Sequence, residues 1–229
     1  GGKTYFLLTL IEALLHTNAV LYILDPKNSD LADLGTVMPN VYHTKEEMID
    51  CVNAFYEGMV RRSEEMKRHP NYKTGENYAY LGLPPCFLIF DEYVAFFEML
   101  GTKESVGLLS QLKKIVMLGR QAGYFLIVAC QRPDAKYFSD GIRDNFNFRV
   151  GLGRISELGY GMLFGSDVKK QFFQKRIKGR GYCDVGTSVI SEFYTPLVPK
   201  GHDFLQTIGR LAQERQVMPE QQGKEDVIE

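Results

Sequence analysis

Short apolar runs alternate with longer amphipathic stretches along this chain. Runs of five or six apolar residues occur at positions 19–24, 86–90 and 124–129. Such runs predict strands that are buried on both faces of a sheet. The longer stretches repeat their apolar positions at helical spacing, and they predict helices at 5–15, 44–68, 93–100 and 105–121. The alternation predicts an α/β fold, in which a mostly parallel sheet carries helices on both faces.

The segment 44–68 carries the clearest helix signal. Thr44 and Glu47 have the spacing of a capping box, which marks the start of a helix. Apolar side chains then recur at roughly helical spacing, at Met48, Val52, Phe55, Met59 and Met66. Near the C-terminus the pattern changes to two short strands, 182–185 and 189–194, which predict a β-hairpin, followed by a final helix at 202–215.

Composition limits the functions that this chain can have. Its 229 residues, 45% of them hydrophobic, suffice for one large α/β domain or a domain with an appendage. No apolar run approaches the roughly 18 residues that a membrane span needs. The four cysteines form no C-x-x-C pair, which favours reduced thiols and a cytosolic setting.

The net charge of −1 means that any contact with nucleic acid must come from a local face. The segment 169–180 is one candidate, because it holds six basic residues and no acid, interleaved with Phe172 and Phe173. Two interpretations remain open for it. It either contacts phosphates or forms a solvated rim that touches a neighbouring subunit.

The first four residues, Gly1, Gly2, Lys3 and Thr4, match the end of the phosphate-binding motif G-x-x-x-x-G-K-[ST]. In that motif backbone N–H groups cradle the phosphates, the Lys reaches the β and γ oxygens, and the hydroxyl holds Mg²⁺. The apolar helix at 5–15 fits this motif, since phosphates bind at helix N-termini. The upstream half of the motif and the strand before it precede Gly1, so we expect this exact polypeptide to bind ATP poorly and to leave a sheet neighbour unpaired.

Two adjacent carboxylates, Asp91 and Glu92, end the apolar run 86–90. The carboxyl end of a buried strand is where open α/β sheets bind their ligands. We therefore expect Asp91 to orient Mg²⁺ through its water shell and Glu92 to polarise the attacking water. An acidic strand end that merely caps the next helix is the alternative. With Lys3, the pair predicts ATP hydrolysis.

Other polar residues follow the predicted strands at the same edge. They are Asp25 to Lys27 after the first strand and Gln131 with Arg132 after the third. Gln131 has the chemistry to hydrogen-bond the γ-phosphate or the attacking water. The alternative is a glutamine whose side chain satisfies backbone groups at a turn.

Several motifs together resemble FtsK/SpoIIIE-type DNA translocases. The segments 119–126 and 129–133 resemble the region around the Q-R-P signature of that family. Asp25-Pro26-Lys27 is similar to its D-P-K strand end and Asp91-Glu92 to its D-E pair, and 142–146 with Arg149 resembles the segment that reaches its next strand. The resemblance covers residues 1 to about 155. Within the family, residues 179–182 and 192–202 are similar to the coupling ATPases of conjugative elements in Gram-positive bacteria.

The resemblance implies a RecA-like P-loop NTPase that assembles into a ring, usually a hexamer, with each ATP between adjacent subunits. An arginine from the neighbouring subunit would then stabilise the transferring phosphoryl group, and the candidates are Arg120, Arg132 and Arg149. Any of them has an alternative role in an ion pair with Asp140 or Asp144.

The resemblance also implies that double-stranded DNA passes through the channel of the ring. Lys136 and Arg143 are the candidates for DNA contacts, because translocases grip phosphates from loops on the inner rim. The expected organisation is a RecA-like ATPase domain over residues 1–200, a C-terminal helix at 201–217 and a mobile polar tail at 218–229.

The expected function is ATP-driven translocation of double-stranded DNA for conjugative transfer, with chromosome segregation as a close variant. A motor that moves protein in a specialised secretion system is one alternative, and a non-hydrolysing assembly module is another. We expect a cytoplasmic location, with the parent protein anchored to the inner face of the cell membrane. Its partners there would be the conjugation machinery, reached through a region upstream of Gly1.

Overall fold

The main sheet has four parallel strands. The computed structural model describes residues 2–168, 170–173 and 176–225. The strand order is β2-β1-β3-β4. Their bounds are β1 Val20–Leu24, β2 Val41–Tyr42, β3 Cys86–Phe90 and β4 Tyr124–Val128. The three predicted strands are confirmed as β1, β3 and β4, all pairing in parallel. Strand β2 was not predicted, since two residues are too short to show a pattern.

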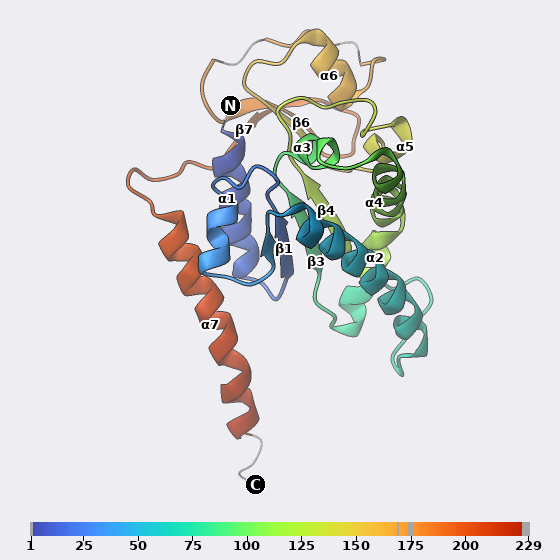
Figure 1. The fold of residues 1–229 in the computed structure, drawn as a ribbon, viewed down its shortest axis with the longest axis vertical. Coiled ribbons are helices and arrows are strands. Elements are labelled where there is room, and N and C mark those ends of the chain that lie inside the picture. The colour runs from blue at the N-terminus through green and yellow to red at the C-terminus, as the bar shows by residue number, and fades with distance from the viewer. Residues whose placement is uncertain (1, 169, 174–175, 226–229) are drawn as a thin grey trace.

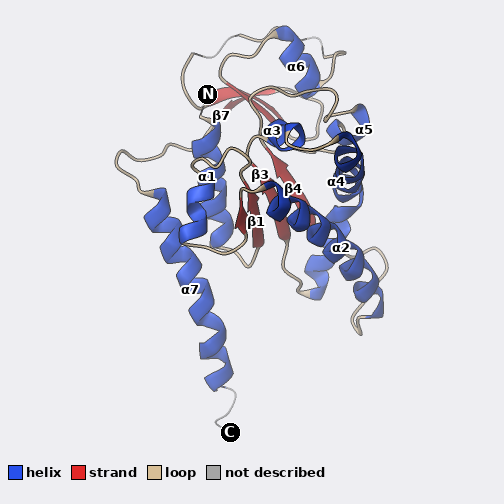
Figure 2. Cartoon of the chain, in the orientation of Figure 1, coloured by secondary structure: helices blue, strands red, loops and turns tan. Residues whose placement is uncertain are grey.

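Helices cover both faces of this sheet, as predicted (Figures 1 and 2). One face carries α2 (Lys45–Arg68), α3 (Tyr93–Glu98) and α4 (Thr102–Ala122). The other face carries α1 (Lys3–Leu15), the 3₁₀ helix η1 (Ala32–Thr36) and α7 (Phe204–Glu225). A second 3₁₀ helix, η2 (Tyr78–Leu81), precedes β3.

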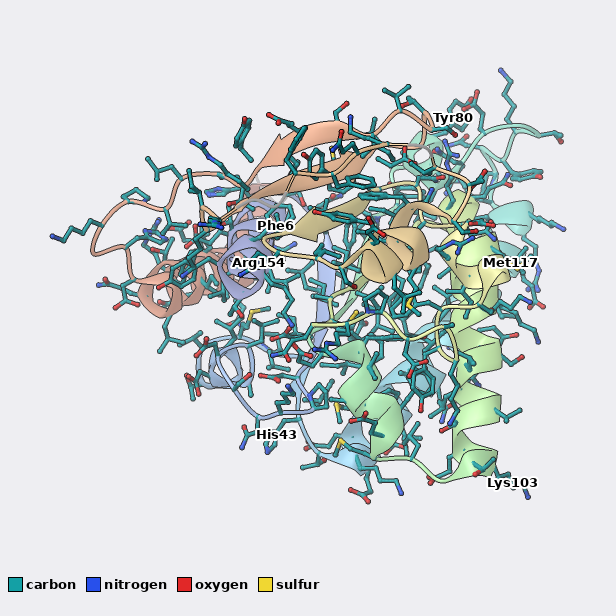
Figure 3. All side chains as sticks on the ribbon, turned by 90° about the horizontal axis from the view of Figure 1, so that it is seen from above. Phe6, His43, Tyr80, Lys103, Met117 and Arg154 are labelled. Atoms are coloured by element: carbon teal, nitrogen blue, oxygen red, sulfur yellow. The ribbon has the colours of Figure 1, made fainter. Side chains whose placement is uncertain are left out.

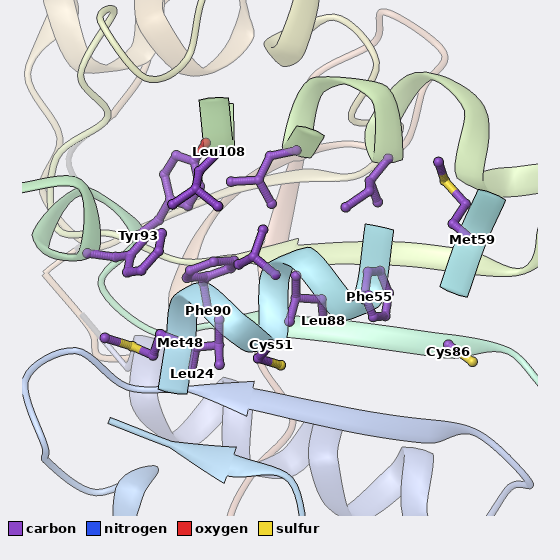
Figure 4. Close-up of a cluster of buried hydrophobic side chains, with 14 of the residues drawn as sticks. Leu24, Met48, Cys51, Phe55, Met59, Cys86, Leu88, Phe90, Tyr93 and Leu108 are labelled. Atoms are coloured by element: carbon purple, nitrogen blue, oxygen red, sulfur yellow. The ribbon is translucent and has the colours of Figure 1, made fainter. Parts of the chain in front are cut away.

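Successive residues of β3 point to opposite faces of the sheet and so join two different cores. Leu88 and Phe90 pack with the α2 and α4 side chains (Figure 4), whereas Ile89 packs with those of α1 and α7. All three are at most 1% exposed. A strand buried on both faces explains why the sequence shows a continuous apolar run here.

Helix α2 begins as the capping box predicts. The Thr44 side chain accepts a hydrogen bond from the Glu47 backbone N–H and donates one to Glu47 Oε2. The five apolar positions predicted along this helix are all buried: Met48, Val52, Phe55, Met59 and Met66. Among the described residues, none of the helices is long and apolar enough for a membrane crossing.

A second, antiparallel sheet lies over the carboxyl ends of the parallel strands (Figure 1). Its order is β5-β6-β7. The bounds are β5 Arg149–Leu152, β6 Arg180–Asp184 and β7 Ser191–Tyr194. The predicted hairpin is confirmed as β6 and β7, and β6 begins two residues before the predicted start at 182. The parallel arrangement therefore holds for the main sheet only.

Three features of the C-terminal half differ from the prediction. Short helices α5 (Asp140–Arg143) and α6 (Glu157–Phe164) were not predicted, because few residues carry their pattern. The last helix, α7, continues to Glu225, beyond the predicted tail boundary at 218, since the segment is rich in good helix formers such as Gln and Glu. The rest of the predicted tail, 226–229, lies outside the described residues.

Helix α7 docks on α1 and the start of β1. Ile208, Leu211 and Ala212 are buried in the cluster that also holds the apolar face of α1. Near the far end of the contact, the Arg215 guanidinium donates hydrogen bonds to the backbone oxygens of Thr17, at 3.0 Å, and Ala19. The C-terminal helix is thus fixed to the helix that begins with Lys3.

Candidate active site

The parallel register brings the ends of β1, β3 and β4 together. Leu24 pairs with Phe90, and Phe90 pairs with Val128. Just beyond these pairs, the Asp91 N–H donates to the Leu24 oxygen at 3.0 Å. The Tyr93 N–H donates to the backbone oxygen of Ala129 at 2.9 Å. The predicted convergence of these strand ends at one edge of the sheet is therefore present.

Lys3 meets both predicted carboxylates at this edge. It is the first residue of α1, and its Nζ lies 3.0 Å from Asp91 Oδ1 and donates a hydrogen bond to Glu92 Oε1. Asp91 is 3% exposed and Glu92 is 9% exposed. Buried carboxylates are found almost only where a partner compensates the cost of removing them from water. Residues 89 positions apart thus form one charged cluster.

The backbone of Glu92 has an unusual conformation. Its φ of 55° and ψ of 57° lie in the left-handed region, and it occupies the N-cap position of α3. A non-glycine residue there costs on the order of 1 kcal/mol, so the surrounding structure must enforce it. The sharp turn directs the chain from β3 into α3 while Asp91 and Glu92 stay at the strand end. Strain of this kind clusters at functional sites.

Asp25 builds the loop beside the cluster. It is fully buried, and its carboxylate accepts hydrogen bonds from the backbone N–H groups of Lys27 (3.2 Å), Ser29 (2.8 Å) and Ala32 (2.9 Å). These bonds hold the turn that follows β1. The turn presents Lys27, whose Nζ lies 3.8 Å from Glu92 Oε2.

The contact between Lys27 and Glu92 was missed from the sequence. The sequence placed Lys27 at a strand end but assigned it no role. Its position after β1, one strand from the carboxylates, was the signal that could have found it. The Glu92 carboxylate therefore has a lysine at each oxygen, Lys3 at Oε1 and Lys27 at Oε2.

Three features of the described residues fit a bound Mg²⁺–nucleotide. Gly2, with a φ of 97°, is the N-cap of α1, and no side chain caps this helix N-terminus, the kind of end at which anions bind. Thr4 lies in the first turn of the same helix, where the motif places the hydroxyl that holds Mg²⁺. Asp91 Oδ1 is buried without a hydrogen-bond partner, although Lys3 lies 3.0 Å away. An unsatisfied buried carboxylate oxygen is well suited to accept from metal-bound water. Gly1 lies outside the described residues.

Comparison with known proteins identifies the family. No model of a known protein family matches the chain. The chain is 57% identical over 209 residues to the Ftsk domain-containing protein YdcQ of Bacillus subtilis, a match that covers 91% of this chain. This chain belongs to the FtsK family. The FtsK resemblance inferred from the sequence motifs is therefore confirmed. The match covers 43% of YdcQ, so the chain spans less than half of that relative.

Solved structures share the fold of this FtsK domain. The pCW3 conjugation coupling protein TcpA, solved in its monomer form with ATPγS, superposes with a TM-score of 0.74 at 18% identity, covering 94% of this chain and 62% of TcpA. The cytoplasmic domain of the type VII secretion ATPase EccC of Thermomonospora curvata gives 0.64 at 24% identity, covering 90% of this chain and 26% of that one. The predicted RecA-like P-loop fold is confirmed, and the chain is an FtsK-like ATPase domain.

Gln131 of the FtsK domain lies three residues after the end of β4 and is exposed. Its side chain makes no hydrogen bond to other residues that the structure describes. The alternative interpretation, in which the Gln131 side chain satisfies backbone groups at a turn, therefore gains no support. The preceding residue, Cys130, is close enough to Lys3 to feel its charge. Burial raises the pKa of the Cys130 thiol to about 11, and Lys3 opposes the increase. The predicted role of Gln131 stays a prediction.

The three candidate arginines occupy different places. Arg132 is exposed in the turn that follows β4, whereas Arg120 is exposed in the last turn of α4, before β4 begins. Arg149 is engaged within the subunit. It donates to Asp184 Oδ2 and to the Leu163 oxygen, both at 3.1 Å. An ion pair was the alternative role for these arginines, and Arg149 does form one, with Asp184.

The candidate DNA contacts follow β4 in the chain, and neither forms an ion pair or hydrogen bond with Lys3, Asp91 or Glu92 among the described residues. Lys136 is exposed, with its Nζ 5.2 Å from the Tyr137 ring centroid. Arg143 is half-buried and pairs with Asp144 at 3.0 Å. The structure does not bring them into the active site, and their contact with DNA stays a prediction.

The basic segment 169–180 packs partly on the domain itself. Lys170, Lys178 and Arg180 lie over the rings of Tyr182, Tyr5 and Tyr194 at 5.8, 4.3 and 4.9 Å. Lys169 and Lys175 lie outside the described residues. These intramolecular contacts favour a structural role for Lys170, Lys178 and Arg180.

We expect replacement of Lys27 by Met in the full-length protein to lower ATP turnover about twofold to fivefold, since an ion pair this exposed contributes up to about 1 kcal/mol. Nucleotide affinity is expected to stay the same, because Lys27 contacts the loop that carries Glu92 and not the phosphate loop. Steady-state kinetics and equilibrium binding measure the two effects. Lys27→Arg keeps the charge and serves as the control. An unchanged turnover in Lys27→Met would show that the contact does not position Glu92.

Proposed function

We propose that this domain is the ATP-hydrolysing motor of a double-stranded DNA translocase that serves conjugative transfer. The cluster of Lys3, Asp91 and Glu92 carries the proposal. It combines a cation at a helix N-terminus with two buried carboxylates, the groups that phosphoryl transfer needs. A module that only assembles would not require this cluster, which disfavours the non-hydrolysing alternative.

Each residue of the cluster has a distinct role in hydrolysis. Lys3 holds phosphate oxygens, and Thr4 and Asp91 hold Mg²⁺. Mg²⁺ supplies positive charge that offsets the charge developing on the phosphate. Glu92 orients the attacking water and accepts its proton at a carboxylate oxygen. Because Lys3 pairs with Glu92, holding phosphates competes with that pair and frees the carboxylate for water. Lys27 then keeps Glu92 in position.

The proposed assembly is a hexameric ring in which an arginine acts on the neighbouring subunit's nucleotide. Arg132 and Arg120 are the better candidates, because both are exposed. Arg149 is held by Asp184, a residue that is 2% exposed. An arginine supplied in trans contributes roughly a thousandfold or more in rate.

Two likenesses support DNA as the substrate. The relative at 57% identity is named an Ftsk domain-containing protein, and the fold matches a conjugation coupling protein with a TM-score of 0.74. In the proposed ring, Lys136 and Arg143 contact the phosphates of the duplex. The motor would work at the cytoplasmic face of the membrane, with membrane-associated conjugation machinery as its partner.

A motor that moves protein is the second candidate. The observation that favours it is the likeness to EccC, a type VII secretion ATPase, which covers 90% of this chain. The net charge of −1 is compatible with either substrate, since neither requires a strongly basic domain.

Stimulation by DNA separates the two candidates. ATP hydrolysis of the full-length protein is measured with and without double-stranded DNA, with Glu92→Gln as the blank. Strong stimulation that disappears in Glu92→Gln supports the DNA motor. Robust hydrolysis that DNA does not change contradicts it and favours protein transport. Hydrolysis that survives in Glu92→Gln would refute the proposed chemistry.

A further inference from the structure

Strand β1 has an unpaired edge near its amino end. The N–H of Ile23 donates to the Asn40 oxygen at 2.8 Å, on the side of β2. In a parallel strand the backbone groups of every second residue face the same neighbour, so those of Leu21 also point toward β2. Strand β2 begins only at Val41, and within the described part of the chain the Leu21 N–H and C=O have no partner on that side. Leu21 is 3% exposed, and buried backbone groups are paired with few exceptions.

A cavity of about 290 Å³ lies between this edge and α7. Most of its wall is apolar, supplied by Leu15, Leu21, Met38 and Ala212. Leu15 ends the 13-residue helix that begins with Lys3, so the cavity is on the order of 18 Å from the charged cluster. It is therefore separate from the candidate active site. Its volume is at the lower limit for a small-ligand site, which suits a group the size of one amino-acid residue.

A guanidinium lies at the rim of this cavity. Arg215 of α7 is half-buried, and its Nη2 donates hydrogen bonds to the backbone oxygens of Thr17 and Ala19. Arginine has five N–H donors, so those on Nε and Nη1 remain available. Among the described residues, Arg215 forms no ion pair with an acidic side chain. Such a cation is suited to bind a carboxylate. Ala19 precedes Leu21 by two residues, so the guanidinium and the unpaired Leu21 groups share one edge.

We infer that this cavity binds the carboxyl-terminal residue of a partner protein. Aligned antiparallel to β1, that residue donates its amide N–H to the Leu21 oxygen and accepts the Leu21 N–H with its terminal carboxylate. In this direction the carboxylate lies on the Ala19 side of Leu21, where Arg215 pairs with it. The side chain lies on the same face of the sheet as that of Leu21 and enters the cavity, so it is small and apolar.

Two features favour a polypeptide end over a simple apolar acid. The unpaired Leu21 C=O requires an N–H donor, which a fatty acid lacks and a peptide supplies. The Leu21 N–H and Arg215 both require an acceptor, and a terminal carboxylate has an oxygen for each. Asn40 occupies the next pairing position along β1, so only the last residue of the partner pairs there and the preceding chain leaves toward solvent.

Three small probes test this inference by calorimetric titration of the full-length protein. Acetyl-leucine has the amide N–H, the carboxylate and the apolar side chain, acetyl-leucinamide lacks the carboxylate, and isocaproate lacks the amide. We expect acetyl-leucine to bind, and each of the other two to bind roughly 10-fold or more weakly, because a buried group is left unpaired. Equal affinity of acetyl-leucine and either other probe overturns the inference. So does the absence of acetyl-leucine binding at about 10 mM.

Hydrogen exchange of the full-length protein locates the bound probe. Acetyl-leucine should slow exchange of the Leu21 amide, and binding that leaves this amide unchanged places the site elsewhere and overturns the inference. Because this readout and the three probes need no substitution, the inference stays testable even if a variant fails to fold.

Replacing Arg215 with Met should weaken acetyl-leucine about 10-fold and leave acetyl-leucinamide unchanged. A merely structural role of Arg215 would weaken both probes equally, which would overturn its assignment to the carboxylate. Arg210→Met changes an exposed arginine of the same helix and is the matched control. Lys103→Met is a remote control, since Lys103 is exposed on α4, across the molecule from α7 (Figures 1 and 3). Melting temperatures establish that the variants are folded.

Discussion

Replacing Glu92 with Gln is expected to lower ATP turnover by about 100-fold to 10,000-fold, the usual contribution of a general base. The amide has nearly the same size as the carboxylate but cannot accept the proton of the attacking water. Nucleotide binding should persist, because Lys3 and the N-terminus of α1 remain in place. Removing the ion pair with Glu92 also frees Lys3 for phosphates, so affinity is expected to stay equal or increase.

A Glu98→Gln variant is the control for the loss of ATP turnover expected in Glu92→Gln. Glu98 ends the same helix, α3, and is exposed. Glu98→Gln should hydrolyse ATP at the wild-type rate in the full-length protein. Single-turnover kinetics distinguish slow chemistry from slow product release. If Glu92→Gln lost nucleotide binding instead of turnover, Glu92 would be a structural ligand of Lys3 rather than the base.

Replacing Arg149 with Met is expected to lower the free energy of unfolding by roughly 3–5 kcal/mol, the usual cost of breaking a buried ion pair. The Asp184 side chain is only 3% exposed, and the substitution would leave it without the guanidinium 3.1 Å away. Within the described part of the chain, its other oxygen accepts a hydrogen bond from the Gly186 N–H, at 2.8 Å. One backbone hydrogen bond does not offset burial of the charge. Chemical denaturation monitored by circular dichroism measures the loss.

Two further variants separate the structural role from catalysis in trans. Arg149→Met combined with Asp184→Asn should recover part of the stability, because the uncompensated charge is removed. Arg132→Met changes an exposed arginine, and it should leave the free energy of unfolding unchanged. An Arg149→Met variant with wild-type stability but a large loss of hydrolysis would identify Arg149 as the residue that acts across the subunit contact.

The sequence was sufficient for those parts of the fold that depend on local patterns. The apolar runs at β1, β3 and β4 show a two-sided burial that only a covered parallel sheet provides. Thr44 and the apolar spacing after it gave the start and the buried face of α2. The four strand residues of β5 carry too little pattern, and their pairing with β6 spans the intervening helix α6.

The candidate site likewise has residues that the sequence predicted and contacts that it did not. Lys3, Asp91 and Glu92 were predicted together because each belongs to a motif whose chemistry fixes its place at a helix start or strand end. The role of Lys27 was not predicted, because it depends on a turn that the fully buried Asp25 holds in place. The partner of Arg149 was expected close by in the sequence, yet it lies 35 positions away.

The sequence by itself thus determined the three central strands, the long helices, the class of the fold and the residues of the charged cluster, since periodicity and short motifs record local geometry and chemistry. The tertiary structure decided which distant surfaces meet. It set Gly179 against Gly2, Lys178 over Tyr5 and α7 along α1. Such contacts depend on how packed layers fit together, and no local pattern along the chain records that fit.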